Sequence, residues 1–218
     1  MADSKEALAV AKAKLTPAIK VGQFAVFVFG PALPSANVKP SGAVSSHNDV
    51  VKHAEYLRFR TRERLREIGF AADFGEATDI LDFWQRFLHS PNAAATEVLH
   101  ARHVCGAIVI FPATVGSIAE LALFVHKGDI AQKTLAIVHQ GYDGASSFFR
   151  RGVLELFTIF SGRLEFVDYS DHEKCVDEAV RFVKGQYYRQ MDEISDLKWL
   201  ASRNLGSVFD HAVESGTN

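Results

Sequence analysis

The sequence predicts an α/β fold in which helices cover both faces of a mostly parallel sheet. Two short runs, residues 24–29 and 107–111, are almost wholly apolar and do not alternate with polar residues. Strands that are buried on both faces require such runs. Residues 70–74, 134–139 and 163–168 supply three further strand candidates, and helix-forming segments separate them. This alternation predicts a doubly wound five-stranded sheet of the Rossmann-like (flavodoxin-like) type with flanking helices.

Length and composition fit one domain with a helical extension at each end. We expect an N-terminal helix over residues 1–20, the α/β domain over 21–188 and a C-terminal helical extension over 189–218. Hydrophobic residues make up 48% of the chain, which suffices for a substantial core. Residues 191–213 carry an apolar stripe at helical spacing, so we expect this segment to dock on the domain or to join two copies in a homo-oligomer.

Charge and cysteine content restrict the compartment and the partners. The net charge is −2, from 24 basic and 26 acidic residues, so a nucleic-acid or regulatory protein partner would need a local patch. Cys105 and Cys175 flank different predicted elements, which argues against a disulfide framework. The chain shows neither a signal peptide nor an apolar run of about 18 residues. These features predict a cytoplasmic protein that does not bind membranes.

The segment 104–124 is the strongest candidate for a functional site. Its strand stops at Pro112, and a loop of small residues leads into a helix. We expect Gly116 to allow a tight turn with close approach of a ligand. We expect Ser117 to cap the helix and to contact the substrate through its hydroxyl. Such a junction lies at the carboxyl edge of a parallel sheet, where the first N–H groups of the helix favour an anion or a sugar oxygen.

Glu120 has two interpretations on the sequence alone. The pattern from Ser117 to Glu120 fits a capping box, in which the glutamate reaches back to the first residue of its own helix. Alternatively, the carboxylate lies at a ligand cleft and stabilises an electron-poor sugar carbon. Substitution of Glu120 by Gln would separate these alternatives, because glutamine keeps a cap hydrogen bond and loses the charge.

Two loops at the same edge supply further candidates for substrate binding. Gly30 and Pro31 end the first strand, and the long loop after them is either a simple connection or a lid over a ligand, with Gly30 giving access to the backbone. The loop after residues 134–139 contains Tyr142, which could stack on a base.

Basic residues and histidines elsewhere give weaker signals. Most arginines of the helix predicted from about 47 to 68 should be solvated, although Arg58, Arg62 and Arg66 leave one basic ridge for a phosphate or a nucleic acid. His100 and His103 lack the further ligands that zinc needs, so we expect no metal site.

Several segments together resemble the nucleoside 2-deoxyribosyltransferase-like effectors of bacterial retron defence systems. They are AIVIFPATVGSIAELALF, TLAIVHQ, SSFFRRGVLELF and RLEFVDYS, within residues 23–171. The resemblance implies a Rossmann-like fold and a catalytic Glu120 that attacks or stabilises the anomeric carbon of a nucleoside or of NAD. It also implies that His47 and Asn48 lie beside the sugar and that Glu76 contacts the ribose hydroxyls.

These observations lead to two functional hypotheses. In the first, the protein is an N-glycosidase or nucleoside deoxyribosyltransferase-like enzyme that acts on the N-glycosidic bond of a nucleoside, nucleotide or NAD, without a separate cofactor, as a toxic effector in anti-phage defence. In the second, it is a non-catalytic nucleotide-sensing module that signals to a partner. The sequence lacks the glycine fingerprint of dinucleotide-binding dehydrogenases and the P-loop, which argues against hydride and phosphoryl transfer.

Overall fold

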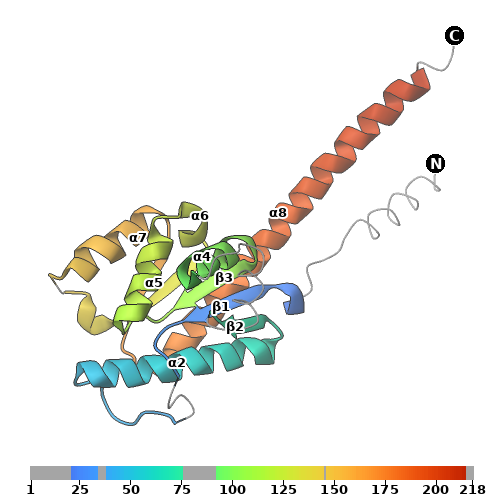
Figure 1. Ribbon diagram of the computed structural model, residues 1–218. Helices are drawn as coiled ribbons and strands as arrows, with labels where there is room; N and C mark the ends of the chain where they lie inside the picture. Colours follow the sequence, from blue (N-terminus) through green and yellow to red (C-terminus); the bar gives the residue numbers. More distant parts are fainter. Residues whose placement is uncertain (1–20, 34–37, 76–91, 145, 215–218) are drawn as a thin grey trace.

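Five parallel strands form one sheet in the order β2-β1-β3-β4-β5 (Figure 1). The computed structural model describes residues 21–33, 38–75, 92–144 and 146–214. Every neighbouring pair of strands is parallel, which confirms the predicted doubly wound α/β fold. The strands are β1 (Ala25–Phe29), β2 (Ala71–Phe74), β3 (Cys105–Ile110), β4 (Thr134–His139) and β5 (Arg163–Val167).

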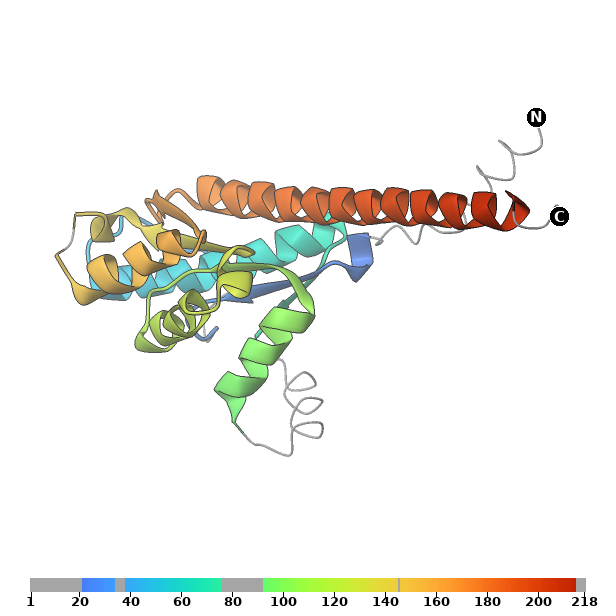
Figure 2. The same ribbon diagram turned by 90° about the horizontal axis from the view of Figure 1, so that it is seen from above.

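Helices cover both faces of the sheet and bury alternate residues of each strand. In β1, Val26 and Val28 join the core under α2 (His47–Ile68) and α8 (His172–Glu214). Phe27 and Phe29 join the second core, under the helices of the opposite face (Figure 2). Those helices are α4 (Ala93–His103), α5 (Val115–Val125), α6 (Gly128–Ala131), the π-helical η3 (Phe149–Leu154) and α7 (Glu155–Ile159).

The strand order creates a switch point between β1 and β3. The chain leaves the carboxyl end of β1 toward α2 on one face, and leaves β3 toward α5 on the other face. In open parallel sheets the two connections diverge at such a point and leave a crevice in which ligands bind. The fold therefore puts the candidate site at the carboxyl ends of these two strands.

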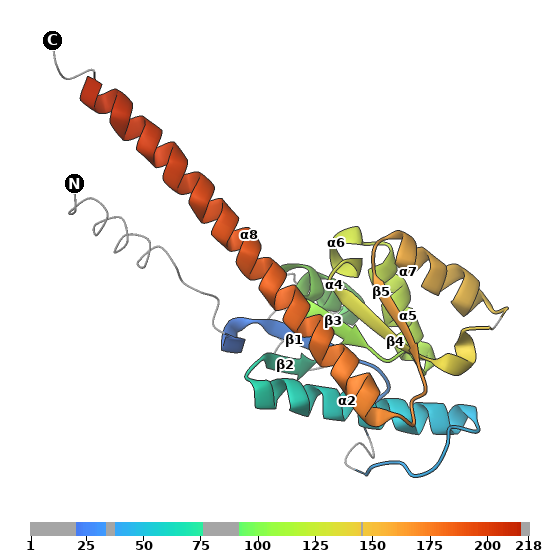
Figure 3. The same cartoon turned by 180° about the vertical axis from the view of Figure 1, so that it is seen from behind.

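The C-terminal part of the chain is one helix rather than two. We expected a break near residue 188 and a separate helix over 191–213, and this prediction was wrong because α8 runs unbroken from His172 to Glu214. The segment contains no proline, and Gly185 is tolerated inside the helix. The first part of α8 crosses the sheet beside α2, and the second part projects far beyond the domain (Figure 3).

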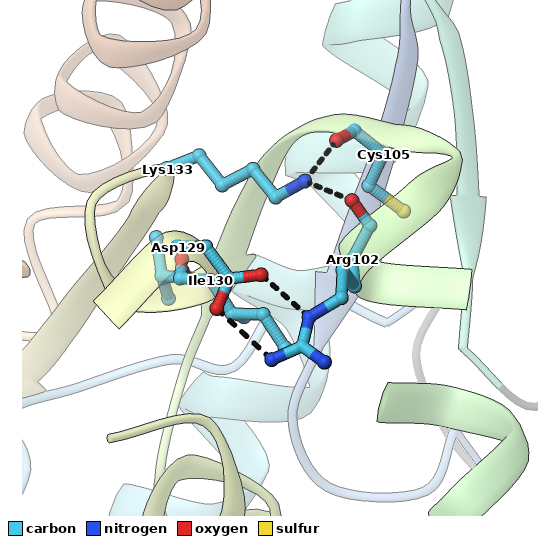
Figure 4. A network of polar contacts seen from close by, with 6 residues as sticks. Arg102, Cys105, Asp129, Ile130 and Lys133 are labelled. Atoms are coloured by element: carbon cyan, nitrogen blue, oxygen red, sulfur yellow. Dashed lines mark hydrogen bonds and ion pairs between the residues drawn. The ribbon is translucent and has the colours of Figure 1, made fainter. Parts of the chain in front are cut away.

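Polar contacts at the opposite, amino edge tie α4, β3, α6 and β4 together (Figure 4). The ammonium group of Lys133 donates to the backbone oxygens of Arg102 at 2.9 Å and Cys105 at 2.8 Å, which satisfies one carbonyl group at the end of α4 and one at the start of β3. Arg102 makes a bidentate ion pair with Asp129. Burial raises the pKa of the Cys105 thiol to about 12, so this thiol stays protonated and unreactive near neutral pH.

Three predictions fall outside the described residues. The N-terminal helix predicted over 1–20 and the ribose-binding role of Glu76 both concern such segments. The side chains of the predicted apolar stripe from residue 197 onward also lie outside them. Among the described residues, no helix is both long enough and apolar enough to cross a membrane.

Candidate functional site

The β3–α5 junction is short and begins its helix earlier than expected. Ala113 is buried, and α5 starts at Val115 with Thr114 as its N-cap residue. Thr114 and Ser117 form the capping box, because the Thr114 side chain accepts from the amide of Ser117 and the Ser117 side chain accepts from the amide of Thr114. The predictions that Ser117 caps this helix and that Ser117 pairs with Glu120 in a capping box were therefore wrong.

Ser117 stabilises the junction through hydrogen bonds to its backbone. Its side chain is buried, and the hydroxyl accepts hydrogen bonds from the amides of Ala113 and Thr114, each at 3.0 Å. The same hydroxyl donates to the carbonyl oxygen of Thr114 at 3.1 Å. We predicted a substrate contact for Ser117, and the hydroxyl instead faces the backbone that leads into α5.

The start of α5 is exposed at Val115 and Gly116. Gly116 is the second residue of the helix, and a Cβ atom added there would have its nearest neighbour, Thr114 Oγ1, at 3.9 Å. This is an ordinary contact, so the expected tight turn at Gly116 is absent and was a wrong prediction. Amides of the first helical turn have no partner inside the helix, so the exposed start of α5 offers donors to a ligand.

Glu120 lies one turn further along α5. The side chain is half-buried and its Oε2 atom is buried. Around the helix, Glu120 lies at the boundary between the buried side, which contains Leu121 and Phe124, and the exposed side, which contains Ala119. Because Thr114 and Ser117 already form the cap, the carboxylate of Glu120 does not serve as the helix cap. Glu120 is absent from the linings of the grooves beside α2 and α8.

The β1–α2 junction is closed by a buried arginine. Arg58 has a relative exposure of 1%, and its guanidinium group donates to the carbonyl oxygens of Val28 at 3.1 Å, Gly30 at 3.1 Å and Pro31 at 2.7 Å. The group also lies over the ring of Phe74, 4.7 Å from its centroid. Arg58 was expected on a basic ridge available to a phosphate or a nucleic acid. This prediction was wrong because the side chain is buried and three carbonyl groups at the end of β1 surround its charge.

Gly30 is required by the packing of this junction. Its φ of 155° lies in a region that favours glycine, and an added Cβ would lie 3.2 Å from Arg58 Cδ and 3.3 Å from the carbonyl oxygen of Phe111. Pro31 is buried beside it. The expected access of a ligand to the backbone of Gly30 is therefore blocked on the side that Arg58 and Phe111 fill.

The start of α2 already holds an anionic group of its own. The carboxylate of Asp49 accepts from the amide of Ser46 at 3.0 Å and from the hydroxyls of Ser45 and Ser46, each at 2.8 Å. Hydrogen bonds from these hydroxyls, that of Ser45 first, lower the pKa of Asp49 to about 2. Ser46 is the N-cap residue of α2.

His47 and Asn48 lie together, on the outer side of α2. With Val38, Pro40 and Lys52 they line an open groove of about 490 Å³ between the preceding loop and the helix. This groove lies on the α2 face of the sheet, whereas Glu120 belongs to α5 on the opposite face. The structure therefore separates the two predicted sugar contacts from the predicted catalytic residue.

Tyr142 lies at the carboxyl edge, in the turn η2 (Gln140–Tyr142) after β4. The side chain is half-buried, and its ring contacts the ring of Phe149 edge-on at a centroid distance of 5.6 Å. Desolvation raises the pKa of the hydroxyl. Tyr142 thus forms a wall between β4 and η3, where the sequence predicted a stacking surface.

A buried histidine pair, which we did not predict, links α2 to α8. His53 Nδ1 lies 2.9 Å from His172 Nε2 and 3.2 Å from the carbonyl oxygen of Tyr169. Desolvation, followed by repulsion from His53 and Lys39, lowers the pKa of His172 to about 4. The spacing of His53 from Val50 and Leu57 was a usable signal, because it puts the imidazole on the buried face of α2. Within the described part of the chain, no three side chains are grouped so that they could bind a metal ion.

Comparison with known proteins identifies the family. The family model described as STM3845 retron effector protein matches residues 57–204. The match begins within α2, includes four of the five strands and continues into the projecting part of α8. No curated protein matches the chain. Since the matched residues make up more than half of the sequence, the chain belongs to the STM3845 retron effector family, which points to a role in defence.

Proposed function

We propose that this effector acts on the N-glycosidic bond of a nucleoside, a nucleotide or NAD, with Glu120 as the catalytic carboxylate. One observation carries the proposal most: the neutral Thr114–Ser117 box forms the cap of α5, so the carboxylate of Glu120 is not needed as a cap. The half-buried Glu120 lies one turn beyond an exposed helix start, at the edge where parallel sheets of this order bind ligands. The resemblance to deoxyribosyltransferase-like effectors supports the same assignment.

The chemistry requires little beyond one placed carboxylate. The bond between C1′ of the sugar and the base nitrogen breaks, and its electron pair leaves with the base while positive charge develops on the sugar. An oxygen of Glu120 stabilises that charge or bonds to C1′ as an ester. Water then attacks C1′, loses a proton and releases the carboxylate; a second base in place of water would give transfer. Nicotinamide leaves NAD as a neutral molecule, so that substrate needs no general acid.

The test is release of free base by the purified full-length chain. NAD and the common nucleosides are incubated with the native protein and with Glu120→Gln, and products are separated by liquid chromatography. We expect base release from at least one substrate and a loss of at least about a thousandfold in Glu120→Gln, as for other removed nucleophiles. Glu155→Gln, on the exposed side of α7, is the matched control and should retain activity. No base release by the native protein, or equal activity of the two variants, would overturn the proposal.

The second candidate is a nucleotide-sensing module. The observation that favours it is the continuity of α8, which starts at the carboxyl edge at His172, contacts α2 through His53, and ends far outside the domain. A ligand bound at this edge would then shift the position of the first turns of α8, and the projecting end of the helix would transmit this shift to a partner. Nucleotide binding without turnover, unchanged in Glu120→Gln, would favour this function over the enzyme.

A further inference from the structure

A second polar groove lies at the amino edge of the sheet, away from the candidate catalytic residue. It has a volume of about 380 Å³ and lies between α8 and the segments that precede β4 and β5. Three arginines from two elements point to its function: Arg163 begins β5, and Arg181 and Arg189 lie two turns apart on α8. Gln132, Ser161 and Gln186 are among the other residues in its lining.

The arginines are held in place and keep donors available. Glu178, whose side chain is 14% exposed, pairs with Arg181 at 2.9 Å and with Arg163 at 3.6 Å, but it does not line the groove. The side chains of Arg163 and Arg181 remain 44% and 67% exposed. Arg163 also pairs with Glu165 through Nε and Nη2, each at 3.0 Å. A guanidinium group has five N–H donors, so Arg163 retains those of Nη1, and Arg181 retains donors after its contact with Glu178. Arg189 is exposed, and no carboxylate of the described residues pairs with it.

Ser161 adds an independent signal at the same groove. Its φ of 65° makes it the one non-glycine residue with positive φ among the residues that the structure describes. The position follows α7, in a turn closed by the hydrogen bond from the amide of Gly162 to the carbonyl oxygen of Phe157 at 2.9 Å. Glycine is the residue usually found at this place in such a turn. Strained residues concentrate at functional sites, and serine adds a hydroxyl donor to the lining.

We propose that this groove binds the phosphate groups of a nucleic-acid strand or of a free nucleotide. Guanidinium groups match phosphate oxygens in geometry and charge, and three of them converge here on a lining without a carboxylate. The volume exceeds what one phosphate fills, which leaves space for an attached sugar. An adjoining groove of about 250 Å³ shares Gln132, Gln186 and Arg189, but Asp129 and Glu193 line it, so the anion is confined to the first groove.

Binding to defined phosphate compounds tests the site. The full-length chain is titrated into a fluorescein-labelled single-stranded DNA of about 15 nucleotides, with unlabelled ATP and inorganic phosphate as competitors. We expect Arg189→Ala and Arg181→Ala to weaken binding about tenfold, as loss of one charge-assisted contact does, and Arg189→Ala to reduce the salt dependence by about one phosphate contact. Lys184→Ala is the matched control, because Lys184 is an exposed cation of the same helix outside both grooves.

The outcomes distinguish the two sources of phosphate. Competition by ATP at concentrations close to those of the oligonucleotide identifies a free nucleotide as the ligand, and binding of the oligonucleotide alone identifies a nucleic-acid strand. The proposal is overturned if none of the three compounds binds, or if Lys184→Ala and Arg189→Ala weaken binding equally. Circular dichroism melts of the variants establish that they are folded. Base release does not enter this experiment, so its result is independent of the proposed catalysis.

Discussion

The two strands that end at the switch point are followed by junctions of opposite character. After β1, the buried charge of Arg58 holds three backbone carbonyls, and the start of α2 carries its own anion, Asp49. After β3, neutral hydroxyls of Thr114 and Ser117 make the turn, and the start of α5 is exposed. Side chains bond to backbone groups at both junctions, but charged side chains do so only at the first.

This difference favours one junction over the other as the place where the proposed ligand binds. An anion at the start of α2 would compete with Asp49, whose carboxylate already occupies the favourable end of the helix dipole. The start of α5 has no acidic residue in its first turn. Under the proposed function, we therefore expect α5, and not α2, to contact the oxygens of the nucleotide. Four changes test the comparison.

The largest expected effect follows the loss of the charged junction. Arg58→Met leaves the carbonyls of Val28, Gly30 and Pro31 without their donors inside the core, and we expect a loss of about 3 to 5 kcal/mol in the free energy of unfolding. Urea denaturation measures it. Arg64→Met, on the exposed side of the same helix, should change stability by no more than about 0.5 kcal/mol. Similar losses in both variants would show that Arg58 has no special role.

The next effect is a pH dependence of stability that arises from His172, which contacts α2 through His53. The pKa of His172 falls from 6.5 in the unfolded chain to about 4 in the native state, so between these values the unfolded state binds a proton that the native state does not. Stability should therefore fall by about 2.5 kcal/mol as the pH drops from 6.5 to 4, and this contribution levels off below pH 4. Urea denaturation of the native protein and of His172→Gln across this pH range isolates the contribution of His172. The difference in stability between the two proteins should shrink toward pH 4. A difference that stays constant with pH would contradict the prediction.

A smaller effect is expected from the neutral junction. Ser117→Ala removes the acceptor for two amides and the donor to Thr114, and should cost about 1 to 2 kcal/mol in thermal or urea unfolding. Ser46→Ala at the start of α2 should cost less, about 0.5 kcal/mol, because Asp49 continues to accept from the amide at that position. A larger loss in Ser46→Ala would reverse the comparison between the two helix starts.

The smallest effect should stabilise the protein. Gly116→Ala adds a methyl group inside a helix where the nearest atom is 3.9 Å away, so we expect a gain of about 0.5 to 1 kcal/mol in the free energy of unfolding. The same methyl group stands at the exposed start of α5 and should weaken binding of the nucleotide substrate. A thermal melt and a binding titration measure the two effects. Destabilisation by alanine would show that the fold itself requires glycine there.

The sheet could be predicted from the sequence because its signal is local. Parallel strands buried on both faces need continuous apolar runs, and the runs ending at Phe29 and near Phe111 give the strand ends to within two residues. The predicted break near residue 188 was wrong because the end of packing along a helix has no local signal in the sequence. No proline or capping residue marks it, and the change from packed to projecting helix depends on where the sheet ends, which is a property of the tertiary structure.

The site could be predicted only in part because capping and burial depend on distant partners. Thr114 and Ser117 each fit a capping pattern, and the choice between them depends on how soon after Pro112 the chain turns into α5. The burial of Arg58 depends on carbonyls about 30 residues earlier in the chain, which helical periodicity cannot show. His53 and His172 are separated by more than 100 residues, so their contact leaves no pattern in either segment.

The unbroken α8 has a mechanical consequence. Tyr187 packs against Phe24 and Phe70 where the helix leaves the sheet. This aromatic contact is the point about which the projecting part of α8 would tilt. The part of the helix beyond it is about 40 Å long at 1.5 Å per residue, so a tilt of only about 5° at the pivot displaces the tip by about 3.5 Å. A change too small to disturb the core would thus be magnified at the far end of the molecule.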